Sequence, residues 1–242
     1  EIARIGVEYI PPGTLLFLAV NVIIHLFDPL HLDIHQVCIG AAHVIGYSQY
    51  ARLILASFFH LDDMHLYYNM SSLLWKGRIL EPQIGTKRFI PLVLVLAVLS
   101  NVILTGINYI GAVYFDKHEM MYTCAAGFSA VLFGLKVVLT KLNRHHTTLL
   151  MGLIPLSGDA VFWGELLLIQ VLIPHASFLG HLSGILAGLL YTNGYLNFLF
   201  AIIDSFIPNI EYNQNNGNNN YNDYNYENAN YQPNYPRRRV IR

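Results

Sequence analysis

A serine and a histidine in two separate apolar stretches are the residues of this sequence that could do chemistry together. Ser129 follows Gly127 and Phe128 in the stretch TCAAGFSAVLFGLKVVLT, residues 123–140. Serine becomes a nucleophile when a base lies within hydrogen-bond reach, and imidazole is the usual base because its pKa is close to neutral. His181, in the stretch FLGHLSGILAGLLY, is the candidate base. The pair predicts acyl transfer through a covalent serine intermediate.

The same two residues also have a purely structural interpretation. Serine is common in membrane helices because its small side chain lets helices approach, and an intramembrane histidine can bond a backbone carbonyl. The serine turn of soluble hydrolases, Gly-x-Ser-x-Gly, is excluded because Val131 stands where its second glycine would be. Chemistry therefore requires that the fold bring Ser129 and His181 to the same level.

Two residues of the stretch HLYYN are candidates for holding the oxyanion of such a reaction. His65 and Asn69 are spaced i and i+4, which places both on one face of a helix. Acyl transfer depends on donors of this kind, because they stabilise the charge that develops on the carbonyl oxygen. Phe133, one turn after Ser129, is expected to lie against the imidazole of His181 and to favour its protonated form.

No carboxylate is expected beside His181, because the topology separates it from Asp159 and Glu165. We therefore predict a dyad rather than a triad. A metalloprotease is the second enzymatic alternative, since His31 and His35 have i, i+4 spacing. It is disfavoured because the sequence contains no His-Glu-x-x-His, and we expect neither a metal nor a cofactor.

The composition places these residues in a membrane. Of the 242 residues, 54% are hydrophobic and 12% are charged, far below the roughly 25% charge of soluble domains. We expect an all-α membrane protein, a bundle of six transmembrane helices, with a turn at residues 192–194 and an interfacial helix after it. The predicted spans are Pro12–Phe27, His65–Leu80, Phe89–Ile110, Thr123–Leu142, Ala160–Ile173 and Ser177–Ile207.

Basic residues are distributed unevenly over the loops of this arrangement. Of the 14 lysines and arginines, Arg52 and Lys117 fall on one side. The others fall on the opposite side, including Lys76 after the second span and Lys136 at the end of the fourth. Because cytosolic loops carry the excess of basic residues, both termini are predicted to be cytosolic. The near-zero net charge argues against a nucleic-acid partner.

In this topology the second, fourth and sixth spans enter the membrane from the non-cytosolic side. Ser129 then lies about 9 Å below that face and His181 about 6 Å below it, at 1.5 Å per residue. Gly184 and Gly188 are expected to let the sixth helix approach closely, and Gly127 to thin the helix that carries the serine. Polar groups that gather under one face do not line a path across the membrane, which disfavours a channel or transporter.

Over roughly residues 50–191, the sequence resembles the rhomboid family of intramembrane serine proteases. The resemblance rests on His65-x-x-x-Asn69, Glu81-x-x-x-Gly85, Gly127-x-Ser129 and Gly180-His181-x-x-Gly184-x-x-x-Gly188, all in family order. It implies a six-helix fold, hydrolysis of transmembrane protein substrates by Ser129 with His181, and an oxyanion hole from His65, Asn69 and the backbone N–H of Ser129. Three positions depart from the family pattern: Ala51, Ala130 and Phe133.

Within the family, the segments around these motifs look most similar to the endoplasmic-reticulum rhomboid-related subfamily that is linked to degradation of membrane proteins. This likeness implies an endoplasmic-reticulum or other endomembrane location and an AAA ATPase partner, for which the basic tip at residues 236–239 would be the binding motif. The alternative from another class is a catalytically silent rhomboid-like protein that binds membrane helices and routes them to degradation.

The remaining segments give a domain plan and several smaller expectations. We divide the chain into an N-terminal segment (1–11), a membrane domain (12–194), an interfacial helix or extension of the last span (195–207) and a disordered Asn/Tyr-rich tail (208–242). Free thiols are favoured for Cys38 and Cys124, because sequence cannot establish a disulfide without geometry. Glu81 is expected to anchor the backbone N–H groups of the Gly85 turn, and His60 to support the first loop.

Overall fold

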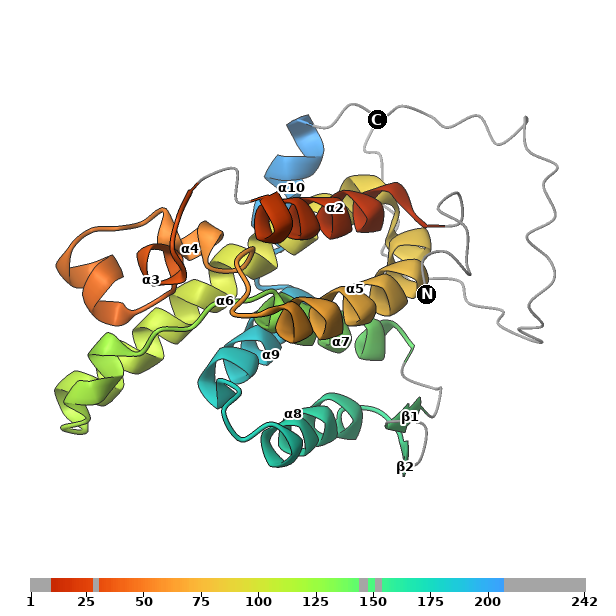
Figure 1. The fold of residues 1–242 in the computed structure, drawn as a ribbon. Helices are drawn as coiled ribbons and strands as arrows, with labels where there is room; N and C mark the ends of the chain where they lie inside the picture. The colour runs from red at the N-terminus through yellow and green to blue at the C-terminus, as the bar shows by residue number, and fades with distance from the viewer. Residues whose placement is uncertain (1–9, 28–30, 144–147, 151–153, 207–242) are drawn as a thin grey trace, which may run out of the picture. The chain divides into compact units, whose positions relative to one another are not determined.

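The computed structural model describes residues 10–27, 31–143, 148–150 and 154–206, and this part of the chain is predominantly helical (Figure 1). The predicted tail at 208–242 and nearly all of the predicted N-terminal segment lie outside the described residues. The elements in chain order are α2 (Pro12–Phe27), α3 (Ile34–Val37), η2 (Ala42–Gly46), α4 (Arg52–Leu55), α5 (Asp63–Ile84), α6 (Thr86–Tyr114), η3 (His118–Tyr122), α7 (Ser129–Leu142), β1 (Thr148–Leu150), β2 (Ile154–Leu156), α8 (Ala160–Leu172), α9 (Phe178–Thr192) and α10 (Asn197–Phe206).

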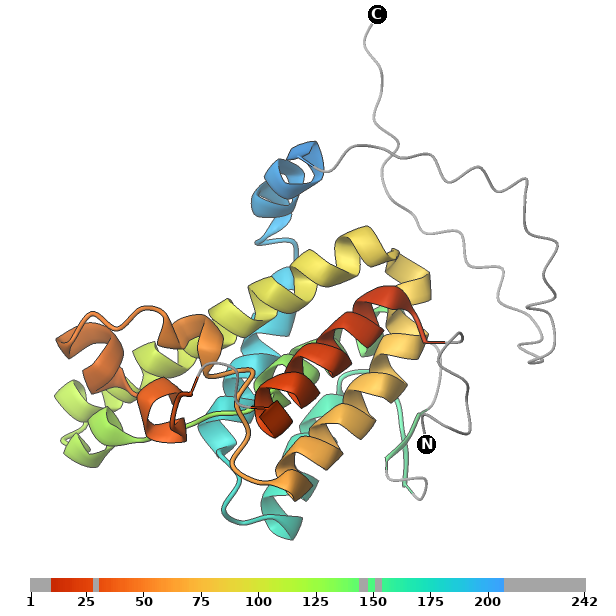
Figure 2. The same ribbon diagram turned by 45° about the horizontal axis from the view of Figure 1, so that its top comes forward.

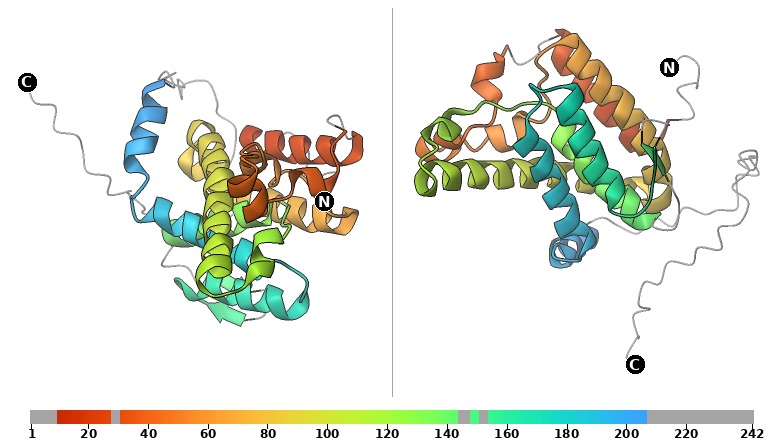
Figure 3. Two further views of the ribbon diagram at one scale, coloured as in Figure 1. Left: turned by 90° about the vertical axis from the view of Figure 1, so that its left-hand side faces the viewer. Right: turned by 90° about the horizontal axis from the view of Figure 1, so that it is seen from below.

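Every predicted span overlaps a helix. The helix α2 has the predicted bounds, and the predicted turn at residues 192–194 separates α9 from α10. By length and apolar composition, α6 is the helix of the described part that could cross a membrane by itself. The helices α9 and α10 pass the same test only as a pair, bent by 75° (Figure 3). The helix lengths thus support one or two crossings, and the count of six stays a prediction.

The helix that carries the serine begins later than the apolar run does. We expected a span from Thr123, but α7 begins at Ser129. Gly127 has a φ of 121°, a left-handed conformation that a helix cannot include. Ser129 is therefore the first residue of its helix, and the depth that we derived from a helix starting at Thr123 was wrong.

The helix α7 forms the centre of the described fold. All of its residues from Ala130 to Leu139 are buried, and it packs against α5, α6, α8 and α9. The helix α2 lies beside α5 on the other side of this core (Figure 2). A polar group at the first turn of α7 is consequently surrounded by side chains from several helices.

Two of the surrounding helices begin with side-chain caps close to candidate site residues. The carboxylate of Asp62 accepts a hydrogen bond of 2.8 Å from the backbone N–H of His65 at the start of α5. The hydroxyl of Ser177 accepts one of 3.1 Å from the N–H of Gly180 at the start of α9. Such caps satisfy N–H groups that have no partner within the helix. They fix where α5 and α9 begin, and hence where His65 and His181 stand.

The loop between α2 and α5 is tied to the segment before α7. Cys38 and Cys124 form a disulfide, so our expectation of free thiols was wrong. Next to them, Ile39 and Ala125 exchange two backbone hydrogen bonds of 2.7 and 3.1 Å. The bridge brings together residues that are 86 positions apart in the chain, a contact that local sequence does not encode.

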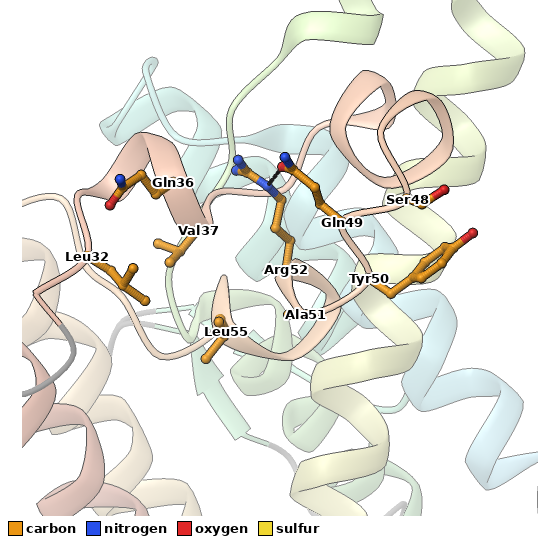
Figure 4. A pocket seen from close by; sticks show the side chains of 9 residues that line it. All are labelled: Leu32, Gln36, Val37, Ser48, Gln49, Tyr50, Ala51, Arg52 and Leu55. Carbon is orange, nitrogen blue, oxygen red and sulfur yellow. Dashed lines mark hydrogen bonds between the residues drawn. The ribbon is translucent and has the colours of Figure 1, made fainter.

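Arg52 organises the same loop from inside. Its guanidinium is buried and donates to the side-chain oxygen of Gln49 at 2.6 Å and to the backbone carbonyl oxygens of His35 and Cys38 at 3.0 and 2.8 Å. Figure 4 shows this arginine beside an open pocket that Leu32, Tyr50 and Leu55 also line. The arginine thus holds the loop together on the side predicted to be non-cytosolic.

A short antiparallel hairpin follows α7, which an all-α expectation did not include. Strand β1 pairs with β2, with Thr148 opposite Leu156 and Leu150 opposite Ile154. The hairpin connects α7 to α8 and adds no layer to the helical core.

Candidate active site

The side chains of Ser129 and His181 lie within hydrogen-bond distance of each other. His181 Nε2 is 3.1 Å from Ser129 Oγ, and the histidine is buried whereas the serine is half-buried. The serine comes from the first residue of α7 and the histidine from the first turn of α9. Because the nitrogen can accept the hydroxyl proton, this geometry suits general-base activation of the serine.

Three glycines allow α7 and α9 to approach this closely. A Cβ atom on Gly184 would overlap the backbone carbonyl of Ala130, and one on Gly188 would come within 2.7 Å of the carbonyl oxygen of Gly134. On the opposite helix, a Cβ on Gly134 would meet the carbonyl oxygen of Gly184 at 3.2 Å. The close contact predicted from Gly184 and Gly188 is confirmed.

Gly127 has a different role from the one that we predicted. It precedes α7 instead of thinning it, and its φ of 121° turns the chain into the helix. Its N–H donates to the carbonyl oxygen of Ala56 at 2.8 Å. A side chain here would also collide with the imidazole of His65, whose Nε2 lies 2.7 Å from the position of a Cβ. The absence of a side chain at Gly127 therefore leaves space for the imidazole of His65 beside the start of α7.

Phe133 stacks on the imidazole of His181, as predicted. The ring centroids are 4.6 Å apart and the rings are inclined by 30°. The other ring nitrogen of the histidine, Nδ1, is buried and has no hydrogen-bond partner within the described ranges. Among the residues that the structure describes, no carboxylate bonds to Nδ1, and the packed phenyl ring takes part in fixing the plane of the imidazole. The arrangement corresponds to a dyad.

The candidate oxyanion donors come from the first turns of α5. Asn69 is buried, and its amide nitrogen Nδ2 has no partner among the described residues. A buried donor without a partner costs free energy, which favours the view that a bound group completes it. His65 lies against Gly127 and close enough to His181 for an electrostatic interaction. The fold thus brings together Ser129, His181, His65 and the turn at Gly127 that leads into α7.

Glu81 serves a different helix from the one that we expected. Its buried carboxylate accepts from the N–H groups of Gly13 and Thr14 at 2.8 and 2.7 Å, and from the hydroxyl of Thr14 at 2.7 Å. It also accepts from the hydroxyl of Thr86 at 2.6 Å. The carboxylate caps the N-terminus of α2, where a negative charge is favourable. Our assignment to the N–H groups of the Gly85 turn was wrong, and Glu81 is remote from the dyad chemistry.

Histidines outside the dyad gather near the start of α5. His60 is buried without a hydrogen-bond partner among the described residues, and its ring lies 5.1 Å from that of His65 and 6.4 Å from that of His25. Burial, together with the neighbouring imidazoles of His65 and His25, lowers the pKa of His60 to about 3. His25 pairs with Asp63 at 2.8 Å. We expected His60 to support the first loop, and it does so as a neutral packing residue.

A buried charge cluster was missed by the sequence reasoning. Lys76 of α5, Lys136 of α7 and Glu165 of α8 meet inside the helical part, and we name them the Glu165 cluster. We had placed Lys76 in a loop and Lys136 at the end of a span, but both lie within helices and are buried. The signal that could have found them was a lysine within an apolar run that continues on both sides.

One group of potential metal ligands exists in the described part of the chain. It comprises His35, Cys38 and Cys124, whose ligand atoms lie within 4.8 Å of one another. Both sulfurs belong to the disulfide and so do not offer the thiolates that bind metals. This group gives no support to the metalloprotease alternative, for which His31 was the second histidine.

The sequence is similar to known proteins. A family model described as Rhomboid domain matches residues 47–198. Rhomboid-related protein 4 of Homo sapiens is 36% identical over 198 residues, which cover 80% of this chain and 61% of that protein. Rhomboid-like protein 14, mitochondrial, of Arabidopsis thaliana is 38% identical over 186 residues, 75% of this chain and 55% of that protein. The chain therefore spans about 60% of the length of these relatives.

Proposed function

The chain belongs to the rhomboid family, and on this basis we propose that it is an intramembrane serine endopeptidase. The observation that carries the proposal is the 3.1 Å distance between Ser129 Oγ and His181 Nε2. A hydroxyl and an imidazole from two different helices have no structural need to meet at the start of a buried helix. Their contact supplies the nucleophile and the base that hydrolysis of a peptide bond requires.

The proposed reaction proceeds in two halves. Ser129 Oγ attacks the carbonyl carbon of the scissile bond while its proton passes to His181 Nε2. The tetrahedral intermediate collapses, the C–N bond breaks, and the leaving amine takes the proton from the histidine. A water molecule then attacks the acyl ester with His181 again acting as base, which releases the new carboxylate and restores the serine.

The negative charge of each tetrahedral intermediate needs donors. We assign them to Asn69 Nδ2, to His65 and to the backbone N–H of Ser129. That N–H lies in the first turn of α7, where helical N–H groups have no partner inside the helix. The amide of Asn69 is buried and unpaired among the described residues, as a donor awaiting an oxyanion should be. Such donors are each worth about 2.7–4 kcal/mol of transition-state stabilisation.

The proposal includes a membrane topology. Rhomboid membership makes the chain a membrane protein. We propose six crossings within residues 12–194, with both termini cytosolic and the dyad below the opposite face, in an endoplasmic-reticulum or other endomembrane. Transmembrane protein helices are the proposed substrates, entering from the bilayer between α5 and α8 and unwinding near their non-cytosolic ends. An AAA ATPase is proposed as the partner of the basic tip, residues 236–239.

A fluorophosphonate probe tests the proposal, because only an activated serine reacts with it. We expect the purified protein in lipid vesicles to be labelled and to cleave a co-reconstituted transmembrane substrate. Ser129→Ala and His181→Ala should each abolish both activities. An unlabelled wild-type protein that still binds membrane helices would favour the catalytically silent alternative. Cleavage that persists in the Ser129→Ala variant would refute the assignment of the nucleophile.

A further inference from the structure

The Glu165 cluster joins three helices through one carboxylate. Glu165 Oε2 lies 3.0 Å from the ammonium of Lys136, and Oε1 lies 3.2 Å from that of Lys76. The lysine side chains are 6% and 8% exposed and the glutamate 19%, so all three charges are largely withdrawn from solvent. Lys76 also donates to the hydroxyl of Ser72 at 2.6 Å, and the ring of Trp75 lies 5.3 Å from the ammonium of Lys136. The carboxylate that pairs with both lysines therefore reaches them only while α8 stays in place.

Physical chemistry makes this connection difficult to break. In an apolar interior, removing one partner of a buried ion pair leaves an uncompensated charge, whereas water would solvate it at a surface. The same two helices α7 and α8 offer a natural comparison at their other contact. There, Lys141 pairs with Asp159 at 2.7 Å, but the aspartate is 52% exposed. An exposed ion pair of this kind contributes little to the stability of the contact between the helices.

Apart from the cluster, α8 is held by few buried side chains. Its buried residues are Val161, Phe162 and Leu166, and it packs against α7 and α9. The ion pair from Glu165 to Lys76 extends the attachment to α5, on the far side of the proposed substrate route. Movement of α8 away from α5 would have to separate this pair.

The cluster lies below the dyad and does not touch it. Lys136 follows Ser129 by two helical turns on α7, and Lys76 follows Asn69 by the same number of residues on α5. The Cα atoms of both lysines consequently lie about 10 Å further along their helices than those of the proposed catalytic residues. Glu165 acts electrostatically on His181, but among the described residues no hydrogen bond joins the cluster to Ser129 or His181. The cluster therefore has no direct part in the proposed proton transfers.

We propose that the Glu165 cluster is a latch that holds α8 against α5 and α7 and must open before a substrate helix reaches Ser129. This inference rests on the proposed function and adds its control of substrate entry. Lys76, Lys136 and Glu165 are thus positioning residues. They limit the cleavage of membrane helices without changing the reactivity of the serine.

The first experiment removes the latch without leaving a buried charge. The triple variant Lys76→Met, Lys136→Met, Glu165→Leu replaces the cluster by apolar side chains, a change that buried ion pairs commonly tolerate. The matched control is Lys141→Met with Asp159→Asn, which removes the exposed pair between the same helices. Both proteins, and the wild type, are reconstituted in lipid vesicles. Each is assayed for cleavage of a transmembrane substrate and for the rate of fluorophosphonate labelling.

We expect the triple variant to cleave the membrane substrate several-fold faster than the wild type, with an unchanged labelling rate. The control should match the wild type in both assays. A triple variant whose cleavage is unchanged, or whose cleavage and labelling fall together, would overturn the latch. Its thermal unfolding midpoint is measured alongside, so that a loss of fold is recognised.

The second experiment closes the latch permanently and does not depend on the stability of the triple variant. The two native cysteines form a disulfide, so in Lys76→Cys, Glu165→Cys only the introduced thiols react with a bis-maleimide. Treatment of the same protein with N-ethylmaleimide is the control. We expect the cross-linked protein to lose cleavage of the membrane substrate and to keep labelling of Ser129. Cleavage at the rate of the control, or loss of labelling, would overturn the proposal.

The two readouts separate this inference from the function on which it rests. If the wild type is not labelled at all, the proposed protease activity fails. If the wild type is labelled and cleaves its substrate but the cluster variants behave like the wild type, the latch alone fails.

Discussion

In α7 every residue from Ala130 to Leu139 is buried, whereas in α8 only Val161, Phe162 and Leu166 are. The two helices are neighbours and similar in length, and both are apolar. One carries the serine and is enclosed by other helices. The other carries no dyad residue and exposes Leu167 and Val171 at 63% and 75%. The fold is closely packed where the proposed reaction takes place and sparsely packed one helix away.

This difference answers two opposing requirements of the proposed function. A hydroxyl and an imidazole must stay within a few tenths of an ångström of their working distance, which requires dense packing around α7 and α9. A substrate helix must also pass from the bilayer to that site, which requires a boundary that can open. Sparse packing with a single charge cluster provides such a boundary at α8. The following predictions test the difference, beginning with the largest effect.

The close packing of α7 against α9 is disrupted most directly by adding one methyl group between the two helices. In Gly184→Ala the new Cβ would overlap the carbonyl of Ala130, which forces the two helices apart. We expect probe labelling and substrate cleavage to fall below detection and the thermal unfolding midpoint to drop. Gly106→Ala in α6 is the control, because nothing lies within 4 Å of its Cβ position. An active Gly184→Ala protein would show that the contact is looser than described.

A second test leaves the close packing of α7 and α9 intact and removes one proposed donor of the oxyanion hole. Asn69→Ala should lower the turnover rate about 10²–10³-fold with little change in KM, because the amide is proposed to bind only the developing oxyanion. The comparison variant is Asn143→Ala, which removes an amide at the C-terminal end of α7, where Asn143 donates to the carbonyl of Leu139. It should retain nearly full turnover. A comparable loss in both variants would remove Asn69 from the oxyanion hole.

The sparse packing of α8 can be tested by comparing two neighbouring residues of this helix. Leu166 of α8 is 1% exposed and its neighbour Leu167 is 63% exposed. Leu166→Ala should destabilise the protein by about 2–5 kcal/mol through the cavity that it leaves, whereas Leu167→Ala should cost much less. Below the unfolding temperature, Leu167→Ala should keep the wild-type rate of probe labelling. Leu166→Ala should lower it, because Leu166 belongs to the same buried cluster as Phe133, whose ring stacks on His181. Equal labelling in the two folded variants would contradict this difference within α8.

The smallest expected effect concerns the buried imidazole beside the start of α5. Because burial lowers the pKa of His60 to about 3, the unfolded chain binds a proton that the folded chain resists. Stability should therefore fall as the pH drops from about 6.5 towards about 3. His60→Phe should show a flatter dependence of the unfolding midpoint on pH.

The exposed His118, whose side chain is 80% accessible, provides the control for this measurement. His118→Phe should retain the pH dependence of the wild type. Equal slopes in the wild type and in His60→Phe would mean that His60 does not resist protonation. The dense packing would then stop short of the loop beside α5.

Local sequence patterns were sufficient to predict the helices but not the contacts between them. The apolar run at Pro12–Phe27 begins with a proline, a residue that is favourable in the first turn of a helix, and it coincides with α2. The i, i+4 spacing of His65 and Asn69 likewise places both on α5. By contrast, the start of α7 depends on the left-handed Gly127, which an apolar run does not reveal.

Three other errors share one physical cause, which is distance along the chain. The partners of Glu81 lie 67 and 68 residues away, the two cysteines are 86 apart, and Lys76 meets Glu165 across 89 positions. A hydropathy scale counts lysine as a residue that is exposed to solvent. Lys76 and Lys136 are nevertheless buried, because a carboxylate that is distant in the sequence forms ion pairs with both. The meeting of Ser129 and His181 is also distant, and it was anticipated because a shared chemistry, and not a local pattern, linked them.

The disulfide between Cys38 and Cys124 has a consequence for the biogenesis of the protein. It fastens the segment that precedes Gly127 and Ser129, so the finished site includes a bond that forms in an oxidising compartment and is rare in the cytosol. In the proposed topology, a newly made chain would acquire this bond only after its first loop had been translocated, so delivery across the bilayer would act as a maturation step.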